Sequence, residues 1–109
     1  MTPPTTPAGV AVVTGGASGI GLAFARSYAA RGAHVVIGDI DEAAMQRARA
    51  ELTSFGTTVD CVWMDLRDAA SIAHLGEVAC QRGRLAAVCL NAGVAASGAP
   101  VWEIPDATY

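Results

Sequence analysis

Three closely spaced glycines, Gly15, Gly19 and Gly21, lie between a β-branched run and a helix-like segment. A glycine-rich turn between a strand and a helix is typical of a nucleotide-binding βαβ unit, because glycine permits a sharp turn, a close approach to phosphate and tight helix packing. The helix start then presents unpaired N–H groups and the positive end of its dipole to the phosphates. We expect Ser18 and the backbone N–H of Ile20 beside the phosphate oxygens. A tight turn that binds no ligand is the alternative.

An acidic residue, Asp39, ends the next apolar run, eighteen residues after Gly21. A carboxylate at about this distance from such a turn accepts hydrogen bonds from ribose hydroxyls, whereas it repels an added 2′-phosphate. Its expected neighbours, Ser18 and Ile40, carry no positive charge. The sequence therefore favours NAD over NADP as the cofactor. An ordinary turn carboxylate ahead of Asp41 is the alternative interpretation.

Residues suited to ligand contact also follow the third and fourth apolar runs. Ligands of open parallel sheets lie outside the carboxyl ends of the strands. At the third run, Asp65 is placed to accept from an adenine amino group, and the N–H of Leu66 to reach a ring nitrogen. At the fourth run, Asn91, Ala92 and Gly93 would let the backbone pass close to a ribose. A plain surface carboxylate and a plain strand-ending turn are the respective alternatives.

The elements that must position these residues alternate along the chain as strand and helix. Short apolar runs predict buried strands, and apolar stripes at helical spacing that end at glycines predict helices. Parallel strands joined by right-handed helical crossovers give an α/β, Rossmann-like, doubly wound parallel sheet. The expected sheet is partial, with strand order 3-2-1-4 and later strands missing. We expect strands at residues 10–14, 34–38, 57–64 and 85–90, and helices at 19–31, between 41 and 56, and at 69–82.

Each predicted helix has an apolar stripe that we expect to face the sheet. The stripes follow steps of three or four residues, the period of an amphipathic helix. They comprise Ile20, Phe24 and Tyr28 in the first helix, Met45, Ala48, Leu52 and Phe55 in the second, and Ile72, Leu75 and Ala79 in the third.

Length and charge exclude several classes of protein. The 109 residues suffice for one small domain, and 52% of them are hydrophobic. No apolar run reaches the roughly 20 residues that span a bilayer, so no membrane contact is expected. The formal net charge of −3 without a basic cluster argues against nucleic-acid binding. Residues 1–8 are predicted to form a flexible arm without the features of a signal peptide.

The inventory of reactive side chains excludes further chemistries. The chain contains no lysine, which excludes a Walker-type phosphate loop and a Schiff base within it. Its cysteines, Cys61, Cys80 and Cys89, lack CxxC spacing and are predicted to be unpaired in a reducing compartment, which favours a cytoplasmic location. The two histidines, His34 and His74, have no cysteine or carboxylate at metal-ligand spacing, so no metal site is predicted.

The four candidate places together resemble the amino-terminal part of the short-chain dehydrogenase/reductase family. Residues 14–21, TGGASGIG, are similar to its TGxxxGxG turn, and Asp39 is similar to its NAD-selecting acid. Residues 65–66 resemble its adenine contact, and residues 90–93 resemble its NNAG motif with leucine in place of the first asparagine. The spacing of the turn indicates the common reductase branch rather than the extended, epimerase-like branch. The resemblance covers residues 8–109.

The resemblance implies hydride transfer between nicotinamide and an alcohol or ketone. The family uses a tyrosine as general acid/base, a lysine four residues later, a serine and an asparagine. None can be assigned here, because Tyr28 is followed at that spacing by Gly32 and Tyr109 precedes the family's catalytic position. Residues 9–109 are therefore expected to be the N-terminal part of an NAD(P)-binding Rossmann domain, truncated before the catalytic half.

The resemblance also implies what the whole protein does. We expect an NAD-dependent oxidoreductase that binds a small alcohol or carbonyl substrate and forms a homo-oligomer, with this fragment inactive by itself. A non-catalytic nucleotide-binding module and an inactive remnant are the alternatives.

Overall fold

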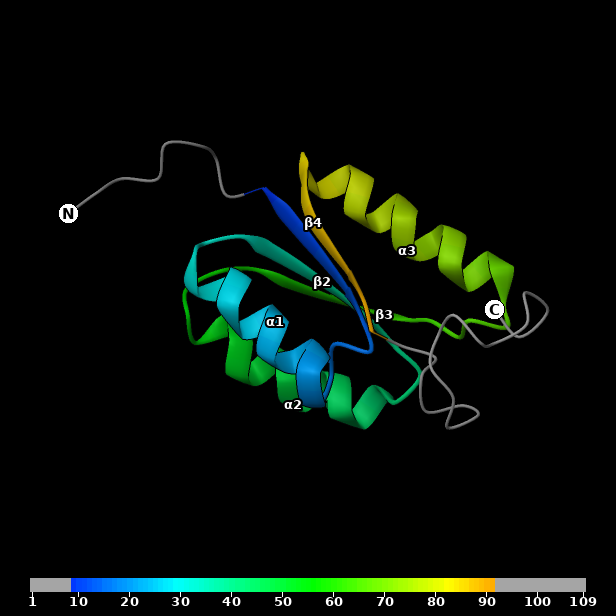
Figure 1. Cartoon of the computed structure of the whole chain (residues 1–109), viewed down its shortest axis with the longest axis horizontal. Helices are drawn as coiled ribbons and strands as arrows, with labels where there is room; N and C mark the ends of the chain where they lie inside the picture. The colour runs from blue at the N-terminus through cyan, green and yellow to red at the C-terminus, as the bar shows by residue number, and fades with distance from the viewer. Residues whose placement is uncertain (1–8, 92–109) are drawn as a thin grey trace.

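The computed structural model describes residues 9–91, and strands and helices alternate throughout this part of the chain (Figure 1). The predicted arm at residues 1–8 and the candidate residues Ala92 and Gly93 lie outside the described residues. The strands are β1 (Val10–Thr14), β2 (His34–Asp39), β3 (Val59–Trp63) and β4 (Leu85–Leu90), and the helices are α1 (Gly19–Ala30), α2 (Glu42–Thr53) and α3 (Ala69–Arg82).

The four strands form one parallel sheet in the order β3-β2-β1-β4. Val12 of β1 pairs with Val36 of β2 on one side and with Val88 of β4 on the other. The register between β1 and β4 shifts once, between Val10 and Ala11. The predicted α/β fold and the predicted 3-2-1-4 order are therefore confirmed.

Helices cover both faces of the sheet, with α1 and α2 on one face and α3 on the other (Figure 1). All five residues of β1 are buried, as are the four central residues of β2. Two faces of apolar contact explain why these strands are continuous valine-rich runs rather than alternating patterns. The face under α1 and α2 is built from residues such as Val13, Ile37 and Leu52, and the face under α3 from residues such as Val36, Val62 and Leu75.

The predicted apolar stripe of α1 contacts the core only in part, through Phe24. Its buried residues are Gly21, Ala25 and Ala29, whereas Ile20 is 77% exposed. Small residues face the sheet because α1 lies close against β1 and β2, and larger side chains flank the contact. Phe24 and Tyr28 are only partly buried, and their ring centroids lie 4.9 Å apart.

The stripes of α2 and α3 are confirmed apart from one residue in each. In α2, Met45, Ala48 and Leu52 are buried, while Phe55 lies beyond the end of the helix and is exposed. In α3, Leu75 and Ala79 are buried and Ile72 is exposed, because Ser71 takes the inward position at the helix start. The side chains of Asp41 and Asp68 cap α2 and α3 by accepting hydrogen bonds from backbone N–H groups.

The cysteines and helix lengths add two smaller findings. Cys61 and Cys89 are half-buried and Cys80 is exposed, and none of the three forms a disulfide. Within residues 9–91, none of the helices is both long and apolar enough to cross a bilayer.

Candidate functional site

The turn that follows β1 folds back against the start of α1. Gly15 has a φ of 67°, and its N–H donates to the carbonyl of Gly38 at 2.7 Å. A Cβ on Gly21 would lie 2.2 Å from the Gly15 carbonyl oxygen and 2.9 Å from Nδ2 of Asn91. Only a residue without a side chain therefore permits this approach of helix and turn.

The start of α1 is open and carries no counter-charge. Gly19 has a φ of 58°, and a Cβ there would meet nothing within 4 Å. Ser18 occupies the N-cap position but makes no capping hydrogen bond with its side chain, and no acidic residue lies in the first helical turn. Ser18 and Ile20 are both exposed. The N–H groups and dipole of this helix end are thus available to an anion.

The carboxylate of Asp39 lies beside the same turn. One of its oxygens accepts from the backbone N–H of Ala17 at 3.3 Å, and the other accepts from the N–H of Asp41 at 3.1 Å. These two bonds orient the group, which ends β2. A carboxylate offers about four acceptor sites, so both oxygens keep capacity for a ligand hydroxyl.

Asn91 joins the end of β4 to the turn. Its backbone N–H donates to Oγ1 of Thr14 at 2.9 Å, and its Nδ2 donates to the Gly15 carbonyl at 3.4 Å. Thr14 also donates to the carbonyl of Cys89 at 3.4 Å. Sequence reasoning missed the role of Thr14. The available signal was a hydroxyl residue ending a buried strand directly before the glycine cluster.

Asp65 belongs to the same edge of the sheet but to a separate set of contacts. Arg67 donates to both of its carboxylate oxygens, at 3.1 and 3.0 Å, and this guanidinium holds the pKa of Asp65 below its usual value. The N–H of Asp65 donates to Oγ of Ser71 at 3.0 Å. Leu66 is partly buried against the core under α3. Asp65 and Asp39 are connected only indirectly, since the N–H of Met64 donates to the Asp39 carbonyl at 3.1 Å.

The structure therefore brings the glycine turn, Asp39 and Asn91 into one hydrogen-bonded group, with Asp65 and Leu66 beside it. All of them lie where parallel strands end, the place at which ligands of open α/β sheets bind. Among residues 9–91, no cluster of three or more histidine, cysteine or acidic side chains could hold a metal ion. The open start of α1 suits an anionic group, and the remaining acceptor capacity of Asp39 suits a hydroxyl donor.

A sequence model of the short chain dehydrogenases matches residues 9–109. The chain belongs to this family. The match covers the glycine turn, Asp39, Asp65 and Asn91.

Two curated short-chain dehydrogenase relatives have high similarity. One is 1-deoxy-11-beta-hydroxypentalenate dehydrogenase of Streptomyces exfoliatus, 47% identical over 97 residues, which are 87% of this chain and 35% of the relative. Another is cis-4-hydroxycyclohexanecarboxylate dehydrogenase of Sinomonas cyclohexanicum, 46% identical over 101 residues, which are 92% of this chain and 40% of the relative. The chain thus spans well under half the length of these relatives.

Solved structures of short-chain dehydrogenases share the fold. A short-chain dehydrogenase/reductase from Burkholderia phymatum in complex with NAD gives a TM-score of 0.69 at 33% identity, covering 73% of this chain and 29% of that one. An alcohol dehydrogenase from Thermococcus sibiricus complexed with 5-hydroxy-NADP gives a TM-score of 0.67 at 29% identity, covering 73% and 35%. The family's structures therefore include both NAD-type and NADP-type cofactors.

Proposed function

We propose that this chain is the cofactor-binding part of an NAD-dependent oxidoreductase that transfers hydride between nicotinamide and an alcohol or ketone. The observation that carries the proposal is the hydrogen bond from Ala17 N–H to the Asp39 carboxylate. This bond joins the glycine turn to an acid that ends the neighbouring strand. Both curated relatives are dehydrogenases by name.

The residues at the start of α1 fit the pyrophosphate of a dinucleotide. The first N–H groups of the helix have no intrahelical acceptor, and the open space at Gly19 leaves room for phosphate oxygens. Ser18 adds a hydroxyl donor that helix capping does not use. We assign Gly15, Gly19 and Gly21 to shaping this cradle, and Ser18 and Ile20 to lining it.

The Asp39 carboxylate fits the adenosine ribose of NAD. It would accept hydrogen bonds from the ribose hydroxyls through lone pairs that Ala17 and Asp41 leave available. A 2′-phosphate at the same place would bring a second negative charge against it. The bound nicotinamide would supply the hydride chemistry, and the residues of this chain would hold and orient the cofactor.

The remaining candidate residues are assigned to the two ends of the cofactor. We propose Asp65 and the N–H of Leu66 as the adenine contact, with Arg67 fixing the carboxylate of Asp65. Asn91, together with Ala92 and Gly93, would line the ribose next to nicotinamide.

The first prediction concerns cofactor choice. Asp39→Ala should raise the Kd for NAD roughly tenfold or more, since hydrogen bonds to a charged group contribute about 1.5–3 kcal/mol. The Kd for NADP should change less or fall, so that the preference for NAD over NADP becomes smaller. Both dissociation constants are measured by titrating the full-length protein with each dinucleotide and recording fluorescence or heat.

Two further variants separate the effect of the Asp39 charge from that of its hydrogen bonds and from that of a nearby charge. Asp39→Asn keeps an acceptor but removes the charge, so it should relax discrimination with a smaller loss of NAD affinity. Glu42→Gln removes a charge from the first turn of α2 and should leave both constants unchanged. If the Asp39→Ala variant kept the same preference for NAD, Asp39 would not be the residue that selects NAD over NADP.

We further propose that the catalytic residues are supplied from outside these 109 residues. The chain contains no lysine, so a tyrosine–lysine pair of the family type cannot come from it. The isolated chain should neither oxidise alcohols nor reduce ketones. Enzymic turnover of a ketone with NADH by residues 1–109 alone would contradict this assignment. Homo-oligomerisation of the whole protein and a cytoplasmic location stay predictions.

A further inference from the structure

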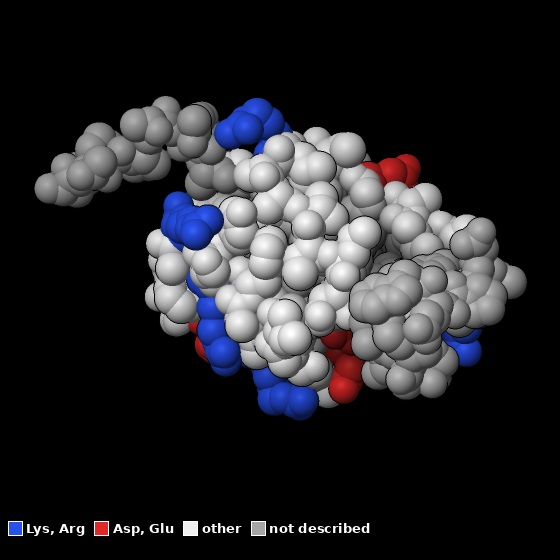
Figure 2. Space-filling view, in the orientation of Figure 1, with Lys and Arg blue, Asp and Glu red and all other residues white. Residues whose placement is uncertain are grey.

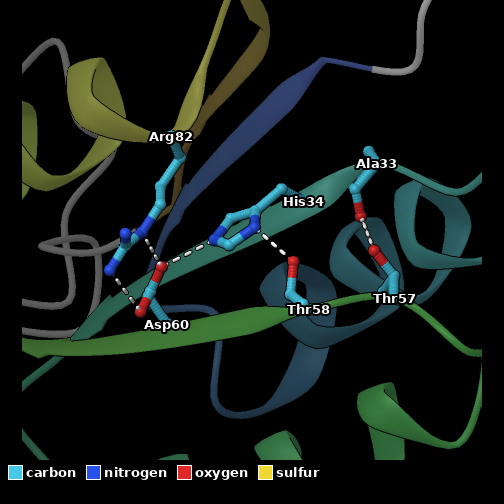
Figure 3. Close-up of polar contacts among 6 residues, drawn as sticks. All are labelled: Ala33, His34, Thr57, Thr58, Asp60 and Arg82. Atoms are coloured by element: carbon cyan, nitrogen blue, oxygen red, sulfur yellow. Dashed lines mark hydrogen bonds and ion pairs between the residues drawn. The ribbon is translucent and has the colours of Figure 1, made fainter.

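A second polar cluster lies at the opposite edge of the sheet, where the strands begin. His34 begins β2, Asp60 lies near the start of β3, Arg82 ends α3, and Thr58 precedes β3 (Figure 3). Together with Arg49 of α2 they line an open pocket of about 360 Å³. Neither the glycine turn nor Asp39 contributes to this pocket, so it is separate from the proposed cofactor site.

Hydrogen bonds hold the cluster in one arrangement (Figure 3). Asp60 accepts from Arg82 through both oxygens, at 2.7 and 3.3 Å. One of these oxygens also lies 2.6 Å from Nε2 of His34, and Nδ1 of His34 contacts Oγ1 of Thr58. The result is a chain of contacts from α3 through β3 and β2 to the loop before β3.

Proton positions in this chain follow from Asp60. Burial alone would raise the pKa of Asp60, but the hydrogen bonds from Arg82 and His34 outweigh it and lower the pKa. An ionised carboxylate only accepts, so Nε2 of His34 carries hydrogen. In a neutral imidazole Nδ1 then accepts from the Thr58 hydroxyl.

The pocket has an excess of cationic donors. Arg49 makes no hydrogen bond or ion pair with its guanidinium among the residues that the structure describes, and Arg82 uses only two of its five N–H groups on Asp60. Asp60 offsets one of these two positive charges. Thr53 and Thr57 also line the pocket, but their hydroxyls already donate to backbone carbonyls.

Positive side chains are also concentrated around this end of the molecule. Figure 2 shows blue side chains along the left and lower margins, on the side where the strands begin and over α1 and α2.

We propose that the pocket formed by Arg49, Arg82, His34 and Thr58 binds the oxyanion of a small organic phosphate or carboxylate. Arg49 and Arg82 line the same pocket, and guanidinium groups pair well with phosphate and carboxylate oxygens. The volume falls at the lower end of the range for small-molecule sites, and it leaves space for a short carbon skeleton beside the anion.

The test uses inorganic phosphate, with chloride at equal ionic strength as the reference. The experiment uses the full-length protein with saturating NAD, which keeps phosphate away from the glycine turn. The imidazole signals of His34 and His74 are followed by NMR. His74 lies on the exposed side of α3 beside Glu77 and outside the pocket. Phosphate should shift the His34 signal saturably and leave the His74 signal in place.

Matched arginine variants locate the site. Arg49→Gln should weaken phosphate binding about tenfold or more, the usual consequence of losing a charge-assisted hydrogen bond. Arg47→Gln removes the same charge from an exposed position of α2 outside the pocket and should leave the affinity unchanged. Acetate in place of phosphate tells whether a carboxylate is preferred.

Three results would overturn the proposal: a linear His34 response, equal shifts of both histidines, or equal affinities of the two arginine variants. Failure of NAD binding would not affect any of these readings, because they report on His34 and Arg49.

Discussion

Gly21 marks the closest contact between α1 and the turn after β1. A methyl group there would overlap the Gly15 carbonyl oxygen at 2.2 Å, a backbone atom that cannot move aside as the end of a flexible side chain can. Gly76 provides the opposite case, because it lies in the exposed part of α3 and a Cβ there would meet nothing within 4 Å. Packing therefore requires glycine at position 21, whereas at position 76 it does not.

Gly21→Ala should destabilise the fold by about 1–3 kcal/mol, the usual cost of overpacking. It should also weaken dinucleotide binding, because α1 must move away from the turn. Gly76→Ala should stabilise the protein by about 0.5–1 kcal/mol through helix propensity. Urea unfolding of both variants measures the free energies. If the two variants had equal stability, the packing role of Gly21 would be refuted.

At single positions, the sequence indicated chemistry better than it indicated contacts. Asp39 was singled out because its type and distance from the glycines predict a ribose contact; the structure places its carboxylate beside the N–H of Ala17, and its role toward a cofactor stays a prediction. The partner of Asp65 could not be fixed, since a bond from Arg67 depends on how the loop folds. The role of Thr14 was missed because a threonine at a strand end is also common without any such bond.

Among the elements, Asp60 ties β3 to β2 through His34 and to α3 through Arg82. Its pKa is lowered in the folded protein. A group with a lowered folded pKa stabilises the fold above its unfolded pKa, and this contribution is lost as the pH falls through the folded value.

Asp60→Asn should therefore lower the free energy of unfolding at neutral pH, on the order of 1 kcal/mol for a partly exposed charged group. The difference from the original protein should shrink below about pH 4, where free aspartate takes up a proton. Glu77→Gln, which removes a charge from exposed α3, is the control. Denaturant unfolding across this pH range measures both, and a difference that stays constant in acid would contradict the assigned charge state.

Element order was predictable because each apolar run and each glycine stop is a local signal. The inward faces were less predictable. In α1, hydrophobicity pointed to Ile20, but the sheet lies too close for it and selects Gly21 and Ala25 instead. In α3, Ile72 lost the inward position to Ser71, whose hydroxyl donates to the carbonyls of Asp65 and Asp68. Both errors arise from tertiary distances that no residue period encodes.

At the scale of the whole molecule, β4 is the least covered strand. It pairs with β1 and, within residues 9–91, with no other strand. Leu85 and Leu90 at its two ends are 53% and 77% exposed, and Val88 is 48% exposed. Exposed apolar strand edges favour pairing with other chains.

Residues 1–109 expressed alone should therefore associate as concentration rises, with poor solubility or loose packing. Leu85→Lys should reduce this association, because a lysine on an edge strand opposes pairing. Ile72→Lys removes an exposed apolar side chain from α3 instead and should reduce it less. Light scattering against concentration compares them, and a soluble monomer with a sharp cooperative melt would contradict the expectation.

The pairing of β1 on both sides has a consequence for synthesis on the ribosome. β2 follows β1 after a single helix, so this parallel pair of strands can form early in synthesis. Thr14 and Cys89, which are joined by a hydrogen bond, are 75 residues apart, so the second side of β1 is paired only after β4 has been synthesised. Until then the nascent protein carries β1, whose five residues are all buried in the folded structure, paired on one side only.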